Sequence, residues 1–226
     1  MVGNGVSNMN TRSIIVISLA VANLLTVATA QSGEWSIGFE WGRATWREPA
    51  WGGGSGSGRY YGPRLAYGRE GKSIDRVAFN FRQGELGAAD RIDLGLSLRY
   101  PLAGTVSVLG EAQYFEYTVD PSGRSRGIGG GVGMETEIPL FQSQFTLVAD
   151  FRGGAFSVET NGPPGNGEPL YFGAGTRLVW VLPQVLLGKN QSFQLETGYR
   201  YRAIRGSGFR ERMDGPYVAA GFAQRF

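Results

Sequence analysis

Hydrophobic and polar residues alternate with a period of two along most of the chain. In the first run, apolar side chains occupy every second position from Trp35 to Trp41, and the positions between them, from Ser36 to Gly42, are small or charged. Successive side chains of a β-strand point to opposite faces, so this pattern predicts a strand with one apolar and one polar face. The same alternation returns at residues 77–82, 92–100, 170–182 and 193–202, and in weaker form at 106–117, 128–138 and 145–158.

Counting these runs gives about ten strands, most of them near the 9–11 residues that a tilted transmembrane strand needs. We predict strands at 34–47, 59–69, 75–82, 91–100, 105–118, 127–138, 144–159, 169–182, 191–203 and 216–226. An even count returns the C-terminus to the side on which the first strand begins. The fold predicted is all-β, an antiparallel transmembrane β-barrel, with eight strands as the alternative if two weak runs are loops.

The connections between the predicted strands alternate in length. Short turns are expected at 70–74, 101–104, 139–143 and 183–190, and longer loops at 48–58, 83–90, 120–126, 160–168 and 205–215. Short periplasmic turns and longer extracellular loops are the plan of outer-membrane barrels. The glycine-rich stretch from Gly52 to Gly58 is expected in a flexible extracellular loop. That from Gly127 to Gly133 is expected in a strand whose missing side chains leave lumen space or let the sheet bend.

A soluble β-sandwich also alternates, with its apolar face in the core. Here, however, the polar face combines glycine with charges of both signs, which is typical of a small barrel lumen filled by ion-paired side chains. We predict a lumen charge network made of Glu40, Arg64, Arg82, Asp93, Arg99, Glu111, Glu135, Glu137, Asp150, Arg152, Arg177, Glu196, Arg200 and Arg202.

Composition narrows the classes of function. The chain has 226 residues, 37 of them glycine, with 12% aromatic and 18% charged residues, which fits one β-rich domain. It has neither cysteine nor histidine, which removes disulfides, thiolate and imidazole metal ligands, and every mechanism that needs them. No cofactor or metal site is expected. The net charge is only +3 and no basic run occurs, so nucleic acid is not an expected partner.

Both ends of the chain carry recognisable signals. Residues 1–30 have one charge, Arg12, then an apolar stretch and Ala28-Thr29-Ala30, which predicts a signal peptide cleaved before Gln31 and a barrel at 31–226. An uncleaved anchor helix is the alternative. The last strand alternates at Val218, Ala220 and Phe222 and ends on Phe226.

This ending resembles the C-terminal assembly signal of small bacterial outer-membrane β-barrel proteins, although Gln224 departs from the usual apolar choice. The resemblance implies an outer-membrane location, contact with outer-membrane lipids and recognition by the barrel-assembly machinery. Two aromatic girdles are expected at the membrane interfaces. One consists of Trp35, Tyr100, Phe145, Trp180 and Phe226, and the other, nearer the outer face, of Trp46, Tyr61, Tyr114, Phe172 and Tyr201.

Enzymatic barrels of this class use a catalytic histidine, and this chain has none. Glu135 and Glu137 share a face and are expected to approach Asp150, but such carboxylates are more often paired with lumen arginines than catalytic. We therefore expect no enzyme and no catalytic residues. The expected role is structural, adhesive or partner-binding through extracellular loops; a narrow pore or small-ligand transport barrel is the alternative, and a histidine-independent envelope enzyme the third hypothesis.

Overall fold

The computed structural model describes residues 33–48, 54–69, 71–87, 89–119, 123–141, 144–161, 166–182, 190–206 and 208–226. The expected signal peptide and its cleavage site lie outside these residues. No helix among the described residues is long and apolar enough to cross a membrane. The strands are β1 (Glu34–Glu48), β2 (Gly54–Gly68), β3 (Arg76–Leu86), β4 (Ala89–Ala103), β5 (Val106–Val119), β6 (Gly123–Leu140), β7 (Phe145–Thr160), β8 (Leu170–Leu182), β9 (Gln191–Gly206) and β10 (Phe209–Arg225).

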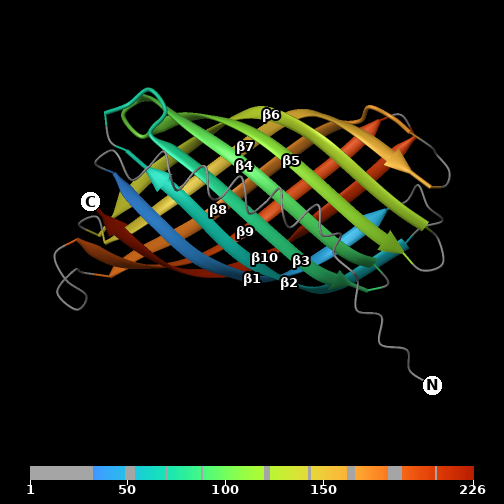
Figure 1. Cartoon of the computed structure of the whole chain (residues 1–226), viewed down its shortest axis with the longest axis horizontal. Coiled ribbons are helices and arrows are strands. Elements are labelled where there is room, and N and C mark those ends of the chain that lie inside the picture. Colours follow the sequence, from blue (N-terminus) through green and yellow to red (C-terminus); the bar gives the residue numbers. More distant parts are fainter. Residues whose placement is uncertain are drawn as a thin grey trace, which may run out of the picture.

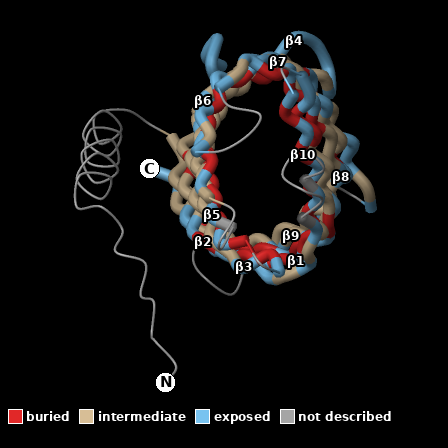
Figure 2. The backbone as a smooth tube through the Cα atoms, turned by 90° about the vertical axis from the view of Figure 1, so that its right-hand side faces the viewer, coloured by how far each residue is buried: buried red, intermediate tan, exposed pale blue. Residues whose placement is uncertain are grey.

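The ten strands form one closed antiparallel barrel in which every strand pairs with its neighbours in sequence. The first and last strands close the ring, because Glu34 of β1 is the register partner of both Gly68 of β2 and Arg225 of β10. Figure 1 shows the strands running obliquely around the long axis, and Figure 2, seen along that axis, shows the chain as a single ring. The predicted fold class and the count of ten strands are confirmed.

Side chains alternate between the inside and the outside of this ring. Along β1, Ile37 is 62% exposed on the outer face, whereas Glu40 on the inner face is 0% exposed. On the opposite wall, Val132 of β6 is 69% exposed. A large apolar exterior around a charged interior is the reverse of a soluble sandwich, in which the apolar face is buried. The outer surface is built to face lipid.

The strands run further than the sequence pattern predicted, so most of the expected long loops are shorter than expected; the connection expected at 160–168 is an exception, since β7 ends at Thr160 and β8 begins at Leu170. β2 begins at Gly54, so residues 54–58 are strand and not flexible loop, and only residues 87–88 separate β3 from β4. β10 likewise begins at Phe209, so most of the expected loop 205–215 belongs to strands. Tight turns are made by Gly87 and Gly104, whose φ values of 71° and 57° lie in the left-handed region that favours glycine. The expected contrast in loop length between the two ends is therefore absent from the described chain.

The sequence pattern did not predict these strand ends, because there the apolar residues lie on the inner face and the polar residues on the outer face. Beyond Trp41 the outward positions of β1 become polar, at Arg43 and Arg47, and the inward positions become apolar, at Ala44 and Trp46. The expected place of Trp46 in the outer aromatic girdle is accordingly wrong. Its side chain is 2% exposed, inside the barrel. Tyr61, by contrast, faces outward and is 41% exposed.

The polar outer surface distinguishes the two ends of the barrel. At the end where β1 begins, apolar side chains such as Trp35, Tyr100 and Phe226 continue almost to the strand ends. At the other end, the outer face turns polar while the strands continue, so the wall projects past the apolar band. Because hydrophilic extensions of these barrels are extracellular, we call this projecting end the extracellular end.

Candidate functional site: the barrel lumen

An aromatic cluster fills the lumen at the extracellular end. Phe115 of β5 stacks against Phe209 of β10 with ring centroids 6.3 Å apart, although four strands separate β5 from β10 in either direction around the ring. We call the buried set the plug. It consists of Ala44, Trp46, Tyr60, Leu86, Ala89, Phe115, Tyr117, Phe156, Val158, Tyr171, Ile204, Phe209, Met213 and Tyr217. Contacts between opposite walls close the lumen at this level.

Glycines of β6 make room for the plug. A Cβ atom on Gly127 would lie 2.4 Å from Cε1 of Phe115, and one on Gly129 would lie 2.7 Å from the ring of Phe156. Both separations are too short for non-bonded carbon atoms. Gly127 and Gly129 therefore leave room for the aromatic rings of the neighbouring strands, which is a more specific role than the lumen space or bending expected from the sequence.

A charge-balanced quartet is buried beside these rings. Arg91 donates to Asp93 at 2.9 Å, and Arg202 donates to Asp93 at 3.0 Å and to Glu211 at 3.1 Å. The Arg91 guanidinium also lies 3.1 Å from Glu211 and 5.2 Å from the ring centroid of Phe115. Because β4 and β9 stand on opposite walls, these bonds tie the barrel across its lumen.

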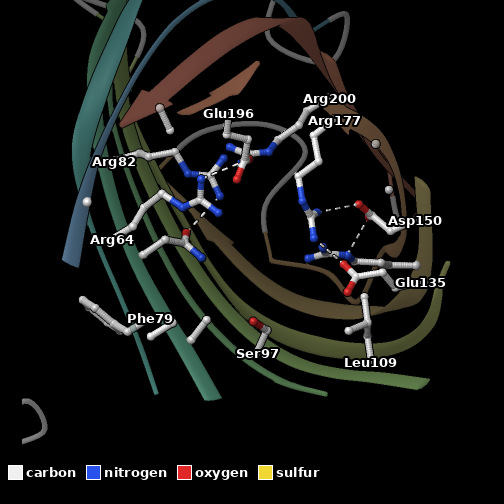
Figure 3. Close-up of a pocket in the computed structure, with 18 of the residues that line it drawn as sticks. Arg64, Phe79, Arg82, Ser97, Leu109, Glu135, Asp150, Arg177, Glu196 and Arg200 are labelled. Carbon is white, nitrogen blue, oxygen red and sulfur yellow. Dashed lines mark hydrogen bonds and ion pairs between the residues drawn. The ribbon is translucent and has the colours of Figure 1, made fainter. Parts of the chain in front are cut away.

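Below the plug, a first ion-pair cluster is centred on Glu40. Its carboxylate accepts hydrogen bonds from Arg200, one of them at 2.8 Å, and lies within 4 Å of the guanidinium groups of Arg64 and Arg82. Arg64 in turn lies 3.0 Å from Glu196. Figure 3 shows the side chains of Arg64, Arg82, Glu196 and Arg200 gathered on one side of the lumen. A fully buried carboxylate requires such compensation, because an isolated charge there is costly.

A second ion-pair cluster lies on the facing wall. Arg177 of β8 donates to Glu135 at 2.6 Å and to Asp150 at 3.4 Å, and Figure 3 shows its guanidinium between the two carboxylates. Arg152 links Asp150 to Glu111, each at 2.9 Å. The cluster is extended toward the periplasmic end by Arg99, which bonds to Asp75 and Glu137.

A cavity of about 190 Å³ lies between the two clusters. Lining arginines outnumber lining carboxylates. The arginines are Arg64, Arg76, Arg82, Arg99, Arg152, Arg177, Arg200 and Arg202, and the carboxylates are Glu135, Asp150, Glu196 and Asp214. The side chain of Arg76 on β3 forms no ion pair or hydrogen bond with the described residues. The lining arginines other than Arg76 are ion-paired, several of them with carboxylates outside the cavity lining such as Glu40, Glu111 and Glu211, so the cavity has one unengaged guanidinium, that of Arg76.

The structure places the sequence-predicted charges on the inner wall, where each forms at least one ion pair. The expected approach of Glu135 to Asp150 is found, since the two are register partners on β6 and β7. Among the described residues, no group of three or more acidic side chains is arranged to hold a metal ion. The residues expected to form the assembly signal, Val218, Ala220, Phe222 and Phe226, lie on the outward face at the end of β10.

Sequence reasoning missed four charged residues of the lumen: Asp75, Arg76, Arg91 and Glu211. Arg76 and Arg91 share strand parity with predicted lumen residues, Arg82 and Asp93 respectively, so period-two counting alone would have included them. Glu211 was hidden because β10 was expected to begin at Pro216. In a longer β10, Glu211 lies on the same face as Tyr217, because the two positions are an even number of residues apart, and this would have placed Glu211 in the lumen.

The closed barrel, the apolar exterior and the charged interior make this chain an outer-membrane β-barrel protein. No protein-family model and no curated protein matches the sequence. Solved structures do match.

Neisserial surface protein A is 14% identical over 86% of this chain and 99% of its own, with a TM-score of 0.40. The translocator domain of the autotransporter NalP from Neisseria meningitidis is 12% identical over 95% and 98%, with a TM-score of 0.41. The outer-membrane protease OmpT from Escherichia coli is 10% identical over 87% and 97%, with a TM-score of 0.37. Likenesses this distant concern the barrel fold alone.

Proposed function

We propose that this protein is a non-conducting, non-enzymatic outer-membrane barrel that stabilises the envelope and binds partners through its extracellular end. The observation that carries the proposal is the plug. Rings from opposite walls, such as those of Phe115 and Phe209, meet at van der Waals range and occupy the lumen. A path for ions through this layer would have to cross a packed apolar core, in which charges are strongly disfavoured.

The state of the lumen carboxylates supports a non-enzymatic role. Glu135 and Asp150 are both engaged by Arg177, and Glu40 is surrounded by three guanidinium groups. A general acid or base needs a carboxylate that can reach a substrate and exchange a proton near neutral pH. Carboxylates whose oxygens are held by guanidinium donors are not free to bind a substrate, which suits a structural role.

The projecting wall supports a role in binding partners. Beyond the apolar band, the outward faces of the strands carry polar and charged residues, including Arg124 and Arg126 of β6. These strands continue the hydrogen-bonded ladder, so their side chains are held on a rigid scaffold. Such a rim offers a partner a preorganised surface, which lowers the entropic cost of binding.

Single-channel recording in planar bilayers tests the proposal. The folded mature protein is expected to give no reproducible current steps. The variant Phe115→Ala/Phe156→Ala, which removes two rings of the plug, is expected to give steps under the same conditions. Ile128→Ala/Val132→Ala, on the lipid-facing side of β6, is the matched control and is expected to remain silent. Reproducible steps from the unmodified protein would refute the proposal.

A second candidate function, storage or transport of a small anion, is favoured by Arg76. Its guanidinium lines the cavity, forms no ion pair with the described residues and stands among other arginines, an arrangement that suits phosphate or a carboxylate. Calorimetric titration of the folded protein with inorganic phosphate and with sulfate tests it. Binding that Arg76→Gln abolishes supports a lumen site. Absence of heat from both anions, or heat unchanged in the variant, excludes it for these ligands.

A further inference from the structure

Three pairs of arginines stand directly opposite each other on the outer surface of the extracellular end. The register pairs Arg43 with Arg59 across β1 and β2, Arg47 with Arg212 across β1 and β10, and Arg205 with Arg210 across β9 and β10. All six side chains are exposed. We call this set the arginine belt. It lies on four adjacent strands of one side of the barrel, β9, β10, β1 and β2.

Directly opposed like charges destabilise a sheet, so the belt has a cost that something else must offset. Five of its members, Arg43, Arg47, Arg59, Arg205 and Arg210, form no ion pair with the described side chains. The sixth, Arg212, donates to Asp214 at 2.9 Å and lies over the ring of Tyr201. Glu85 of β3 is the register partner of Arg59 but forms no ion pair with it, so two neighbouring carboxylates stand against six guanidinium groups.

On the other side of the barrel, the outward-facing arginines form ion pairs. There Arg124 lies 2.6 Å from Glu116, and Arg126 donates to Glu159 at 2.7 Å. Both pairs join neighbouring strands at the same end of the barrel. The unbalanced charge is therefore a property of one side and not of the extracellular end as a whole.

The position of the belt identifies the region of the membrane that it meets. On the outer face, Arg43 is the next residue after Trp41, and Arg59 the next after Tyr61, whose ring stacks on Phe39 with centroids 6.2 Å apart. Two residues along a strand span about 7 Å. Aromatic rings of this kind lie at the membrane interface, so the lowest pair of the belt lies level with lipid headgroups.

We propose that the arginine belt binds a phosphate-bearing lipid headgroup in the outer leaflet. A guanidinium group binds phosphate through two parallel hydrogen bonds, and two opposed guanidinium groups provide such donors from both sides. Neighbouring strands are about 4.8 Å apart, so four strands span about 14 Å, enough for a headgroup with more than one phosphate. The phosphates supply the negative charge that the protein does not, and they convert a repulsive surface into an attachment to the lipid.

The test compares thermal unfolding in two lipid environments. The mature protein is folded into phosphatidylcholine vesicles alone and into phosphatidylcholine vesicles that contain bisphosphorylated lipid A. Its midpoint is read from the gel mobility shift on heating. The variants are Arg43→Gln/Arg59→Gln and Arg205→Gln/Arg210→Gln, and the matched control is Arg124→Gln/Arg126→Gln.

We expect the effect of the belt variants to change sign between the two environments. In phosphatidylcholine alone, each should raise the midpoint by about 1–3 °C, because a repulsion has been removed. With lipid A, the unmodified protein should gain stability and the belt variants should gain less. The unfolding midpoint of the control variant should not rise in phosphatidylcholine, because this variant loses ion pairs. With lipid A, the control should gain as much stability as the unmodified protein does.

Two results would overturn the inference: belt variants that are less stable in phosphatidylcholine alone, or a gain from lipid A that is equal in all proteins. Native mass spectrometry of the unmodified protein gives a reading that does not depend on any variant. Bisphosphorylated lipid A should remain bound at a collision energy that strips its dephosphorylated form. Equal retention of the two forms would show that phosphate is not recognised.

Discussion

The indole of Trp46 on β1 meets the ring of Tyr117 on β5 edge to face, with centroids 5.5 Å apart, across the lumen of the barrel. Both residues lie on strand ends where the inner face has become apolar. Adjacent strands are held by backbone hydrogen bonds, but only side chains can join walls that are not neighbours. The plug thus gives this barrel an interior core in addition to its continuous sheet.

Trp46→Ala should therefore destabilise the folded barrel by about 3–5 kcal/mol, the usual effect of removing a large buried aromatic side chain. Urea unfolding in detergent micelles, followed by tryptophan fluorescence and by gel mobility, measures the change. Trp41→Ala is the control, because Trp41 is 48% exposed on the outer face and its loss leaves no internal void. A larger loss for Trp41→Ala than for Trp46→Ala would contradict the interior core.

Glu40→Gln should cost about 3–5 kcal/mol, since it leaves the guanidinium groups of Arg200, Arg64 and Arg82 without their shared carboxylate. Adding Arg200→Met should recover part of this loss, because one uncompensated charge is removed together with its desolvation cost. Glu159→Gln is the matched control. Its side chain is 54% exposed, and its ion pair with Arg126 should contribute at most about 1 kcal/mol. If the double variant were less stable than Glu40→Gln alone, the clustered charges would not explain the cost.

Gly127→Val should prevent the plug from packing, because even a Cβ atom at this position overlaps the ring of Phe115. We expect a loss of about 1–3 kcal/mol or more from overpacking. Phe115→Ala/Gly127→Val should be less impaired than the sum of its parts, since the truncated ring vacates the space. Gly110→Val is the control, because a Cβ atom there meets nothing within 4 Å. Additive losses in the double variant would show that the glycine acts through the backbone instead.

The sequence predicted a strand wherever the alternation of apolar and polar residues kept the same phase along the whole strand. Lipid outside and water inside impose a single phase of alternation, which is why the runs around Leu96 and Leu195 predicted strands of the barrel. The rule changes at the extracellular end, where solvent is outside and an apolar plug is inside. Residues such as Trp46 and Glu211 were misassigned or missed for this reason.

The partners of the lumen charges were beyond prediction for a different reason. Period two assigns a residue to the inner face, but it does not say which residues meet across the lumen. The bond between Arg202 and Asp93 depends on the number of strands and on their register around the closed ring. The contact of Glu40 with three arginines likewise depends on how the barrel closes.

Phe226→Ser should reduce the amount of barrel in the outer membrane several-fold while leaving the stability of the refolded protein almost unchanged. The reason is that Phe226 is 70% exposed at the end of the chain, so it contributes little burial, whereas a terminal aromatic residue is what the expected assembly signal requires. Cell fractionation measures the first quantity and urea unfolding of the refolded protein the second. Val132→Ser, at a residue that is also lipid-facing and 69% exposed, is the matched control and should not lower the amount assembled. Equal depletion of both variants would indicate a general loss of lipid-facing surface, and a large loss of stability in Phe226→Ser would indicate a structural role in place of a recognition signal.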